Sequence, residues 1–347
     1  MKRNKKFTVL TVLALSLTIA LTGCGKKEET AASAVPASVA PAGTAAAIAA
    51  PTAAPTEDKD KVLRIGYQKY GTVNFLKAQG KLDKTLADKG VKVEWIEFPG
   101  GPQLLEALNV GSIDFGHTGE APPIFAQAAG APLVYLAHEP ASPESEAIII
   151  PKDSPIKTVA DLKGKKVVLN KGSNVHYLLV KQLEAAGLKY TDVETIFLKP
   201  GDARIAFEQG KADAWVIWDP FFAAAQTATG AKILADGKDS VSNTEFYLAT
   251  RNYAQNNPNT IKVVLDELTA VDAWAKDNQG ELAKQLAPLL GIDIPSLELA
   301  SKRRNYGVLP IDDEIIAQQQ KIADAFLAVE LIPKAIVVKD AVLPKSQ

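Results

Sequence analysis

Four short turns in this chain combine glycine with residues that can donate hydrogen bonds. Glycine allows a ligand to approach the backbone closely, and the free N–H groups at the start of a helix attract an anion. Each turn lies between an expected strand and an expected helix, so the pattern predicts an anion site that needs no lysine or arginine. Each turn alone would also suit ordinary helix capping. The turns are Gln68 to Thr72, Phe98 to Pro102, His117 to Glu120 and Asn170 to Asn174.

Within these turns, candidate ligand-binding residues fall into two groups. Glycines and prolines would let the backbone reach the anion, while hydroxyl and amide side chains would donate to it or cap the helix. The first group is Gly71, Gly101, Pro102 and Gly119, and the second is Gln68, Thr72, Ser173 and Asn174.

Four further side chains have two readings each. Trp218 ends an expected strand, where its ring could pack on the organic part of a ligand or belong to the core. Asp219 could face the ligand, although a helix cap before Pro220 is the simpler role. His176, in the first turn of a helix, could donate to a bound anion or cap locally, and we prefer the local role. Glu120 is either a first-turn charge or a ligand contact.

No residue pattern in the sequence indicates catalysis. There is no Ser-His-Asp order with a nucleophile elbow and no phosphate-binding loop. His117 and His138 have no cysteine or carboxylate partner at metal-ligand spacing, so we expect no metal site and no cofactor.

Alternating strands and helices must position these turns. The apolar segments repeat as strand then helix with short connections, which is typical of an α/β fold. We expect two lobes, the first formed by residues 62–151 and 246–347 and the second by residues 152–245, with a ligand cleft at the carboxyl ends of the strands. One helix is expected over residues 73–88, and the strand at 146–150 is expected in the first lobe.

The N-terminus has the three regions of a bacterial lipoprotein signal. Basic residues at positions 2, 3, 5 and 6 precede an apolar run over residues 7–21, which is too short for a permanent membrane span, and Cys24 follows small residues. We expect cleavage after residue 23 and lipidation of Cys24, which would anchor the protein to the outer face of the cytoplasmic membrane. An ordinary secretory signal with a chance cysteine is the alternative. Residues 24–61, rich in alanine, proline and threonine, are expected to form a disordered tether.

Composition narrows the function classes. The chain has one cysteine, so no internal disulfide can form. Removal of the four basic residues of the signal leaves 35 basic against 40 acidic residues, and this mildly acidic balance does not suggest a nucleic-acid partner. The remainder, with no second long apolar run, reads as a soluble globular protein, and we expect a monomer.

Four longer strings resemble one known family. Residues 98–135 (FPGGPQLLEALNVGSIDFGHTGEAPPIFAQAAGAPLVY), 154–167, 171–179 and 213–222 resemble the aliphatic-sulfonate-binding proteins of ABC importers. These belong to the periplasmic binding proteins that also serve nitrate, taurine and thiamine-precursor uptake. The resemblance, over residues 62–333, implies a type II two-lobed fold that closes about a hinge. It also implies capture of alkanesulfonates and their delivery to an ABC permease with its ATPase.

On this resemblance, the sulfonate would lie between Gly71 with Thr72, Gly119, and Ser173 with Asn174 from the opposite lobe. Glu120 stands where the family is expected to have aspartate, so it could instead select zwitterionic amino-sulfonates such as taurine. Receptors for taurine, nitrate or a pyrimidine precursor remain the alternatives within the fold. A pyrimidine synthase of the related fold is disfavoured because the chain lacks that enzyme's cysteines, and a purely structural surface lipoprotein would show no ligand-dependent closure.

Overall fold

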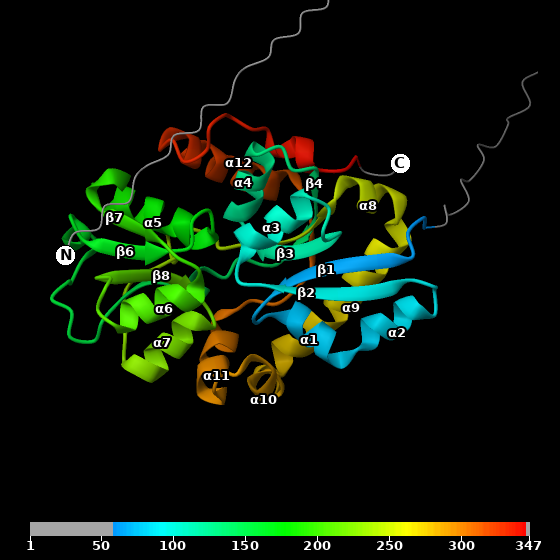
Figure 1. Ribbon diagram of the computed structural model, residues 1–347, viewed down its shortest axis with the longest axis horizontal. Coiled ribbons are helices and arrows are strands. Elements are labelled where there is room, and N and C mark those ends of the chain that lie inside the picture. Colours follow the sequence, from blue (N-terminus) through cyan, green and yellow to red (C-terminus); the bar gives the residue numbers. More distant parts are fainter. Residues whose placement is uncertain (1–57, 345–347) are drawn as a thin grey trace, which may run out of the picture. The chain divides into compact units, whose positions relative to one another are not determined.

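The computed structural model describes residues 58–344 of the chain, and two β-sheets with flanking helices dominate it (Figure 1). The first sheet contains β1 (Val62–Gln68), β2 (Lys92–Phe98), β3 (Phe115–Gly119), β4 (Leu133–His138), β10 (Glu245–Thr250) and β11 (Leu309–Pro310). The second contains β5 (Glu146–Ile150), β6 (Lys166–Leu169), β7 (Glu194–Phe197), β8 (Ala214–Trp218) and β9 (Lys232–Asp236). The strand orders are β11-β4-β10-β3-β1-β2 and β7-β6-β8-β5-β9.

The helices follow the strands in the order expected for repeated strand-helix units. In the first half of the chain they are α1 (Thr72–Gln79), α2 (Lys81–Ala87), α3 (Gly101–Asn109), α4 (Ala121–Ala128), α5 (Asn174–Ala185) and α6 (Pro200–Glu208). In the second half they are α7 (Phe221–Thr229), α8 (Arg251–Asn256), α9 (Pro258–Asp277), α10 (Gln279–Leu290), α11 (Ile294–Arg303) and α12 (Asp313–Ala328). Between residues 58 and 344, no helix is long and apolar enough to cross a bilayer.

Parallel pairing explains why the glycine turns gather. In the first sheet β1 pairs in parallel with both β2 and β3, and in the second β6 pairs in parallel with both β7 and β8. The carboxyl ends of parallel strands meet at one sheet edge, so the turns that follow them lie together.

Two connections join the lobes and run beside each other. Residues 139–145 lead from β4 to β5, and residues 237–244 lead from β9 back to β10. The N–H of Glu139 donates to the carbonyl of Glu245 at 2.8 Å, and the N–H of Ser142 donates to that of Ser242 at 3.1 Å. The Asn243 amide also donates to the carbonyl of Ser142 at 2.9 Å. These bonds make the two connections one hinge element.

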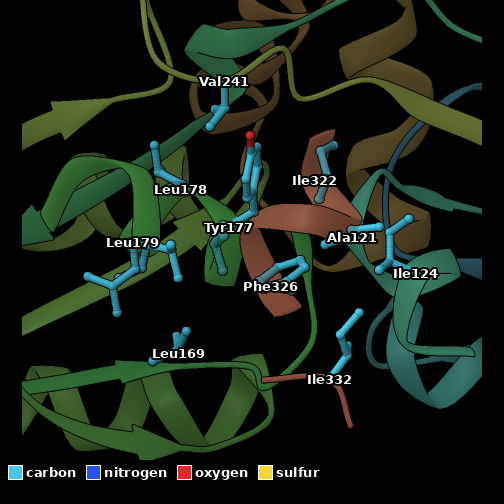
Figure 2. Close-up of a cluster of buried hydrophobic side chains, with 14 of the residues drawn as sticks. Ala121, Ile124, Leu169, Tyr177, Leu178, Leu179, Val241, Ile322, Phe326 and Ile332 are labelled. Carbon is cyan, nitrogen blue, oxygen red and sulfur yellow. The ribbon is translucent and has the colours of Figure 1, made fainter. Parts of the chain in front are cut away.

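One apolar cluster includes residues of both lobes. Figure 2 shows Ala121 and Ile124 of α4 near Ile322 and Phe326 of α12, with Tyr177 and its neighbours on α5. The Phe326 ring lies 4.8 Å from that of Phe125 and 5.7 Å from that of Tyr177, measured between centroids. Because these side chains are largely buried, the lobes share part of their hydrophobic core.

The structure corrects two expectations about the elements. The strand at 146–150 belongs to the second sheet, where β5 pairs antiparallel with β8 and β9, so the lobe boundary lies before Glu146 and not after residue 151. The helix expected over residues 73–88 is two helices, because Gly80 adopts a left-handed conformation with φ 63° that ends α1. The expected signal, Cys24 and nearly all of the tether lie outside the described residues.

Candidate anion-binding site between the lobes

The predicted turns of the two lobes meet across a cleft. The side chains of Gln103 and Asn170 face each other, with amide contacts of 3.4 and 3.5 Å. A methyl group added to Gly100 would lie 2.5 Å from Nδ2 of Asn170 and 3.7 Å from the Trp218 ring. One added to Gly119 would lie 2.9 Å from Cγ of Asn174. The starts of α3 and α4 therefore lie against the start of α5 and the end of β8.

Helices α1, α3, α4 and α5 begin without a side-chain cap. Their first N–H groups have no partner inside the helix, so they remain able to bind an anion. By contrast, Thr250, Asp293 and Asp312 cap α8, α11 and α12. Several other helices also lack a side-chain cap, so the indication of an anion site is the meeting of three of these starts (α3, α4 and α5) at one cleft. The fourth, α1, follows β1 at the same edge of the first sheet.

The side chains of Ser173 and Asn174 do not point their donors into the cleft. The Ser173 hydroxyl donates to the carbonyl of Asn170 at 2.7 Å. The Asn174 amide donates to the carboxylate of Glu146 and, at 2.9 Å, to Oδ1 of Asn243. Both side-chain donors have partners within the protein in this conformation, so the group left to a ligand here is the backbone at the start of α5.

His176 bonds within the protein in this conformation, in line with the local role preferred from the sequence. Nδ1 accepts from the N–H of Gly172 at 3.1 Å, which leaves Nε2 to donate to the Tyr190 hydroxyl at 2.7 Å. Burial, together with the charge of Lys171, lowers the pKa of His176 to about 3. The ring is neutral at physiological pH and both of its nitrogens are used.

The side chains of Gln68 and Asp219 also bind within the protein, and that of Thr72 is buried. The Gln68 amide donates to the carbonyl of His117 at 3.0 Å. Thr72 is fully buried, and its side chain lies beside Tyr247 and Asp272 inside the first lobe. Asp219 accepts from the N–H of Ala223 at 2.9 Å, which agrees with the capping role. These positions can offer backbone groups to a ligand more readily than side chains.

Trp218, Gly101 and Pro102 occupy the cleft region. The Trp218 ring is half-buried beside Gly100, where it can contact the organic part of a ligand. Pro102, in the first turn of α3, lines a groove next to the cleft. A methyl group at Gly101 would lie 1.9 Å from Oγ1 of Thr118, so α3 can approach β3 this closely only with glycine there.

Glu120 points toward the hinge. One carboxylate oxygen accepts from the Ser242 hydroxyl at 2.6 Å and from the N–H of Thr244 at 3.0 Å. Burial raises the pKa of Glu120, against the lowering effect of these hydrogen bonds. The contacts favour a structural role at the returning connection over selection of a cationic ligand group.

A buried ionic cluster beside the start of α1 was not found from the sequence. Arg304 donates to Glu139 at 2.5 Å and to Glu245 at 2.7 Å, and His117 lies 2.9 and 3.1 Å from the same two carboxylates. A methyl group on Gly71 would lie 3.5 Å from the Arg304 guanidinium. Nothing in the sequence indicated Arg304 here, because it reaches this position from a distant part of the chain; its guanidinium is paired with the two carboxylates.

The pKa shifts in the cluster follow from its charges. Burial alone would raise the pKa of Glu139, but Arg304 and His117 outweigh it and lower the pKa to about 2. Burial likewise opposes the charged form of His117, yet Glu245 and Glu139 raise its pKa. His117, Glu139 and Glu245 are close enough to hold a metal ion. Arg304 pairs with both carboxylates, and together with a protonated His117 it balances their two negative charges.

Thr118 and Asn170 are further residues that sequence reasoning did not single out. Oγ1 of Thr118 is buried, faces the start of α3, and has no hydrogen-bond partner among residues 58–344. Asn170 meets Gln103 across the cleft. Both lie inside turns that the sequence did indicate, so the turn pattern located them even though their side chains were not chosen.

Two α/β lobes, a paired hinge connection and helix starts that meet in the cleft define a periplasmic-type solute-binding protein. The family model described as NMT1/THI5 like matches residues 86–281. The chain is 44% identical over 294 residues to the putative aliphatic sulfonates-binding protein of Escherichia coli K12, covering 84% of this chain and 91% of the relative. The chain belongs to this NMT1/THI5-like family.

Two other comparisons agree with this family assignment. The putative aliphatic sulfonates-binding protein of Bacillus subtilis 168 is 31% identical over 284 residues, covering 81% of this chain and 86% of that protein. The solved structure of the alkanesulfonate-binding protein SsuA from Xanthomonas axonopodis pv. citri, bound to MOPS, superposes with a TM-score of 0.78 at 40% identity. That match covers 82% of this chain and 99% of SsuA. The expected two-lobed fold and family resemblance are confirmed.

Proposed function

We propose that this protein is an extracytoplasmic receptor that captures aliphatic sulfonates and delivers them to an ABC permease with its ATPase. The observation that carries the proposal is the meeting of uncapped helix starts from both lobes at Gly119 and Asn174. A sulfonate is an anion with acceptor oxygens and no proton to donate, so a ring of N–H donors complements it. Related proteins described as sulfonate-binding support the choice of ligand.

In this proposal the backbone holds the sulfonate head. Free N–H groups at the starts of α1, α3, α4 and α5 donate to its oxygens, and the buried Thr118 hydroxyl adds a donor from the first lobe. Trp218 packs against the organic part of the ligand. Because donors come from both lobes, one bound anion stabilises the closed cleft.

The remaining parts of the proposal concern location and chemistry. Cys24 carries the lipid anchor at the outer face of the cytoplasmic membrane, and the segment up to residue 57 tethers the lobes, since residues 58–60 are already bonded to the start of α9 and the end of α8. The protein acts as a monomer and binds its ligand without catalysis. Mass spectrometry of the purified membrane form tests the anchor, because lipidation adds the mass of the acyl chains to an N-terminal peptide that begins at Cys24.

Isothermal titration with methanesulfonate, butanesulfonate, taurine, sulfate and nitrate tests the ligand class. We expect both alkanesulfonates to bind and sulfate and nitrate to give no measurable heat. Trp218→Ala should weaken butanesulfonate about tenfold and methanesulfonate much less, because only the longer ligand reaches the ring. Trp95→Ala, on β2 and hydrogen-bonded to Asp83, is the control. Failure of every sulfonate to bind, or preference for nitrate or taurine, would contradict the proposal.

A further inference from the structure

Two carboxyl groups, one from each lobe, are buried together at the hinge. Glu120 precedes α4 and is 1% exposed, and Glu146 begins β5 and is fully buried. Asn243 of the returning connection links them. Its Oδ1 accepts from the Asn174 amide at 2.9 Å, and the same amide donates to Glu146. The N–H of the next residue, Thr244, donates to Glu120 at 3.0 Å. The hinge therefore holds two acidic side chains in one hydrogen-bonded network.

These two carboxyl groups have no counter-charge. Within residues 58–344, neither Glu120 nor Glu146 pairs with a lysine, arginine or histidine. Oε1 of each is buried and has no hydrogen-bond partner in the same part of the chain. Two buried negative charges in one network are costly when no cation compensates them, and a proton on one carboxyl group removes the repulsion.

The groups that face Glu146 favour its protonated form. Burial has the largest effect, the charge of Glu120 adds to it, and Glu245 on β10 contributes further repulsion. The Asn174 amide acts in the opposite direction but is outweighed, so the pKa of Glu146 is raised well above its ordinary value. Trp218, opposite Glu146 on β8, carries no charge. Glu146 is therefore the member of the pair that takes up the proton.

A cavity of about 330 Å³ behind the hinge reaches this network from the side away from the cleft. Ser242 lines the cavity, and its hydroxyl donates to Glu120 at 2.6 Å. Tyr177, Asp239 and Lys321 also line it, so its two charged side chains are of opposite sign. The Ser242 hydroxyl thus gives solvent protons access to the carboxyl pair even when the cleft is closed.

The carboxyl pair lies directly behind the proposed anion site. Glu120 follows Gly119 at the start of α4, and Asn174, which binds Glu146, is the first residue of α5. A methyl group on Gly119 would lie 2.9 Å from Cγ of Asn174, so the two helix starts nearly touch. A sulfonate held at these starts places a third negative charge beside the pair. In a buried site this repulsion is only weakly screened, so the bound anion favours the protonated pair.

We propose that Glu120 and Glu146 form a proton-binding site that must be occupied for the cleft to close on a sulfonate, so that the receptor binds its anion together with one proton. The proposal rests on the proposed function, because the second ligand of this site is the sulfonate itself. The proton comes from solvent and moves to a carboxyl oxygen, and no other bond changes. Because the protonated form binds, affinity is highest at low pH and falls as the pH rises.

Methanesulfonate is the probe, because it keeps one negative charge at every pH used. Calorimetric titration of the full-length protein between pH 6 and pH 10 should show affinity falling at least tenfold toward the alkaline end. At the pH where affinity changes most steeply, binding in weakly buffered potassium chloride should raise the pH. A glass electrode should then record uptake of at least about half a proton per bound sulfonate, the amount that a tenfold fall requires.

Glu146→Gln tests the assignment, because it keeps an acceptor for the Asn174 amide but cannot ionise. Its affinity at pH 6 should lie within about threefold of the parent value, and it should lose most of the pH dependence and of the proton uptake. Glu184→Gln is the control, since Glu184 lies near the other end of the same helix in an exposed pair with Lys181. It should keep both properties.

A second variant covers the case in which Glu146→Gln does not fold. Glu120→Gln keeps an acceptor for Ser242 and removes one of the charges that repel a proton from Glu146. Its fall in affinity should therefore begin at a lower pH than in the parent protein. An unchanged profile in this variant would overturn the proton site.

The remaining outcomes separate two failures. If no sulfonate binds at pH 6, the proposed function fails and the proton site fails with it. If methanesulfonate binds with one affinity from pH 6 to pH 10, the proton site alone is overturned. The same holds if Glu146→Gln retains the pH dependence and the proton uptake of the parent protein.

Discussion

Replacement of Arg304 by methionine should destabilise the protein in a strongly pH-dependent way. Arg304 is buried and pairs with Glu139 and Glu245 at 2.5 and 2.7 Å. Arg304→Met keeps an unbranched side chain but leaves Glu139, which is 2% exposed, with His117 as its remaining positive partner in the cluster. Removing one member of a buried ion pair typically costs about 3–5 kcal/mol.

The pKa of Glu139 gives a similar magnitude for the stability that its charge partners supply. Its value of about 2 in the folded protein lies about two units below the ordinary value, which corresponds to about 3 kcal/mol of stability. Because the folded pKa is lowered, this stability is present above about pH 4 and is lost as the pH falls through about 2. In Arg304→Met the same carboxyl should instead take up a proton near neutral pH, since burial then dominates.

Urea unfolding at pH 7 and pH 4 provides the assay. We expect a loss of about 3–5 kcal/mol at pH 7 and a loss smaller by at least about 1–2 kcal/mol at pH 4, where Glu139 is protonated in the variant. Arg204→Met removes a half-exposed pair with Glu208 and should change stability by less than about 1 kcal/mol. If Arg304→Met does not fold, Glu245→Gln can be used instead, because it removes one negative charge at the exposed edge of the cluster. A loss that is equal at both pH values, or no larger than that of the control, would refute the reasoning.

Three further predictions concern the cleft and the buried groups. Gly119→Ala should weaken every sulfonate at least tenfold, as measured by titration, because its methyl group would lie 2.9 Å from Cγ of Asn174, whereas Gly201→Ala, with no atom within 4 Å, should not. His176→Ala should lower the free energy of unfolding by about 2–4 kcal/mol, because it leaves a cavity and an unpaired Gly172 N–H. The affinity for methanesulfonate should stay within twofold of the parent value. A large loss of affinity would mean that His176 contacts the ligand. Burial raises the pKa of Asp272 to about 7, so the stability that its neutral form contributes is full below about pH 4 and is lost as the pH rises through 7. The melting temperature of Asp272→Asn should therefore fall less than that of the parent protein between pH 5 and pH 8. Parallel melting profiles of the two proteins would contradict this.

The sequence predicted the alternating elements and the turns far better than the direction of side chains. An apolar run such as residues 146–150 identifies a buried strand, but nothing in it says which sheet the strand joins, and β5 joins the second. The predicted turns do meet between the lobes, whereas the Ser173 hydroxyl and the Asn174 amide turn to partners within the protein. Arg304 could not be placed at all, because its contact with Glu139 depends on how the chain returns to the first lobe.

The apolar contact between the lobes bears on the lifetime of a complex. Phe326 lies on α12, which packs against α4 of the first lobe, while Tyr177 and His176 lie on α5 of the second, so an opening that separates α4 and α12 from α5 would part these rings. Uncovering one buried aromatic side chain costs roughly 1.5–3 kcal/mol, and a barrier of that size slows a step by about tenfold or more. The dissociation rate of a bound ligand would then depend on residues that never touch it. Substitutions in this distant contact, such as Phe326→Leu, would shorten residence time while leaving the chemistry of the anion site unchanged.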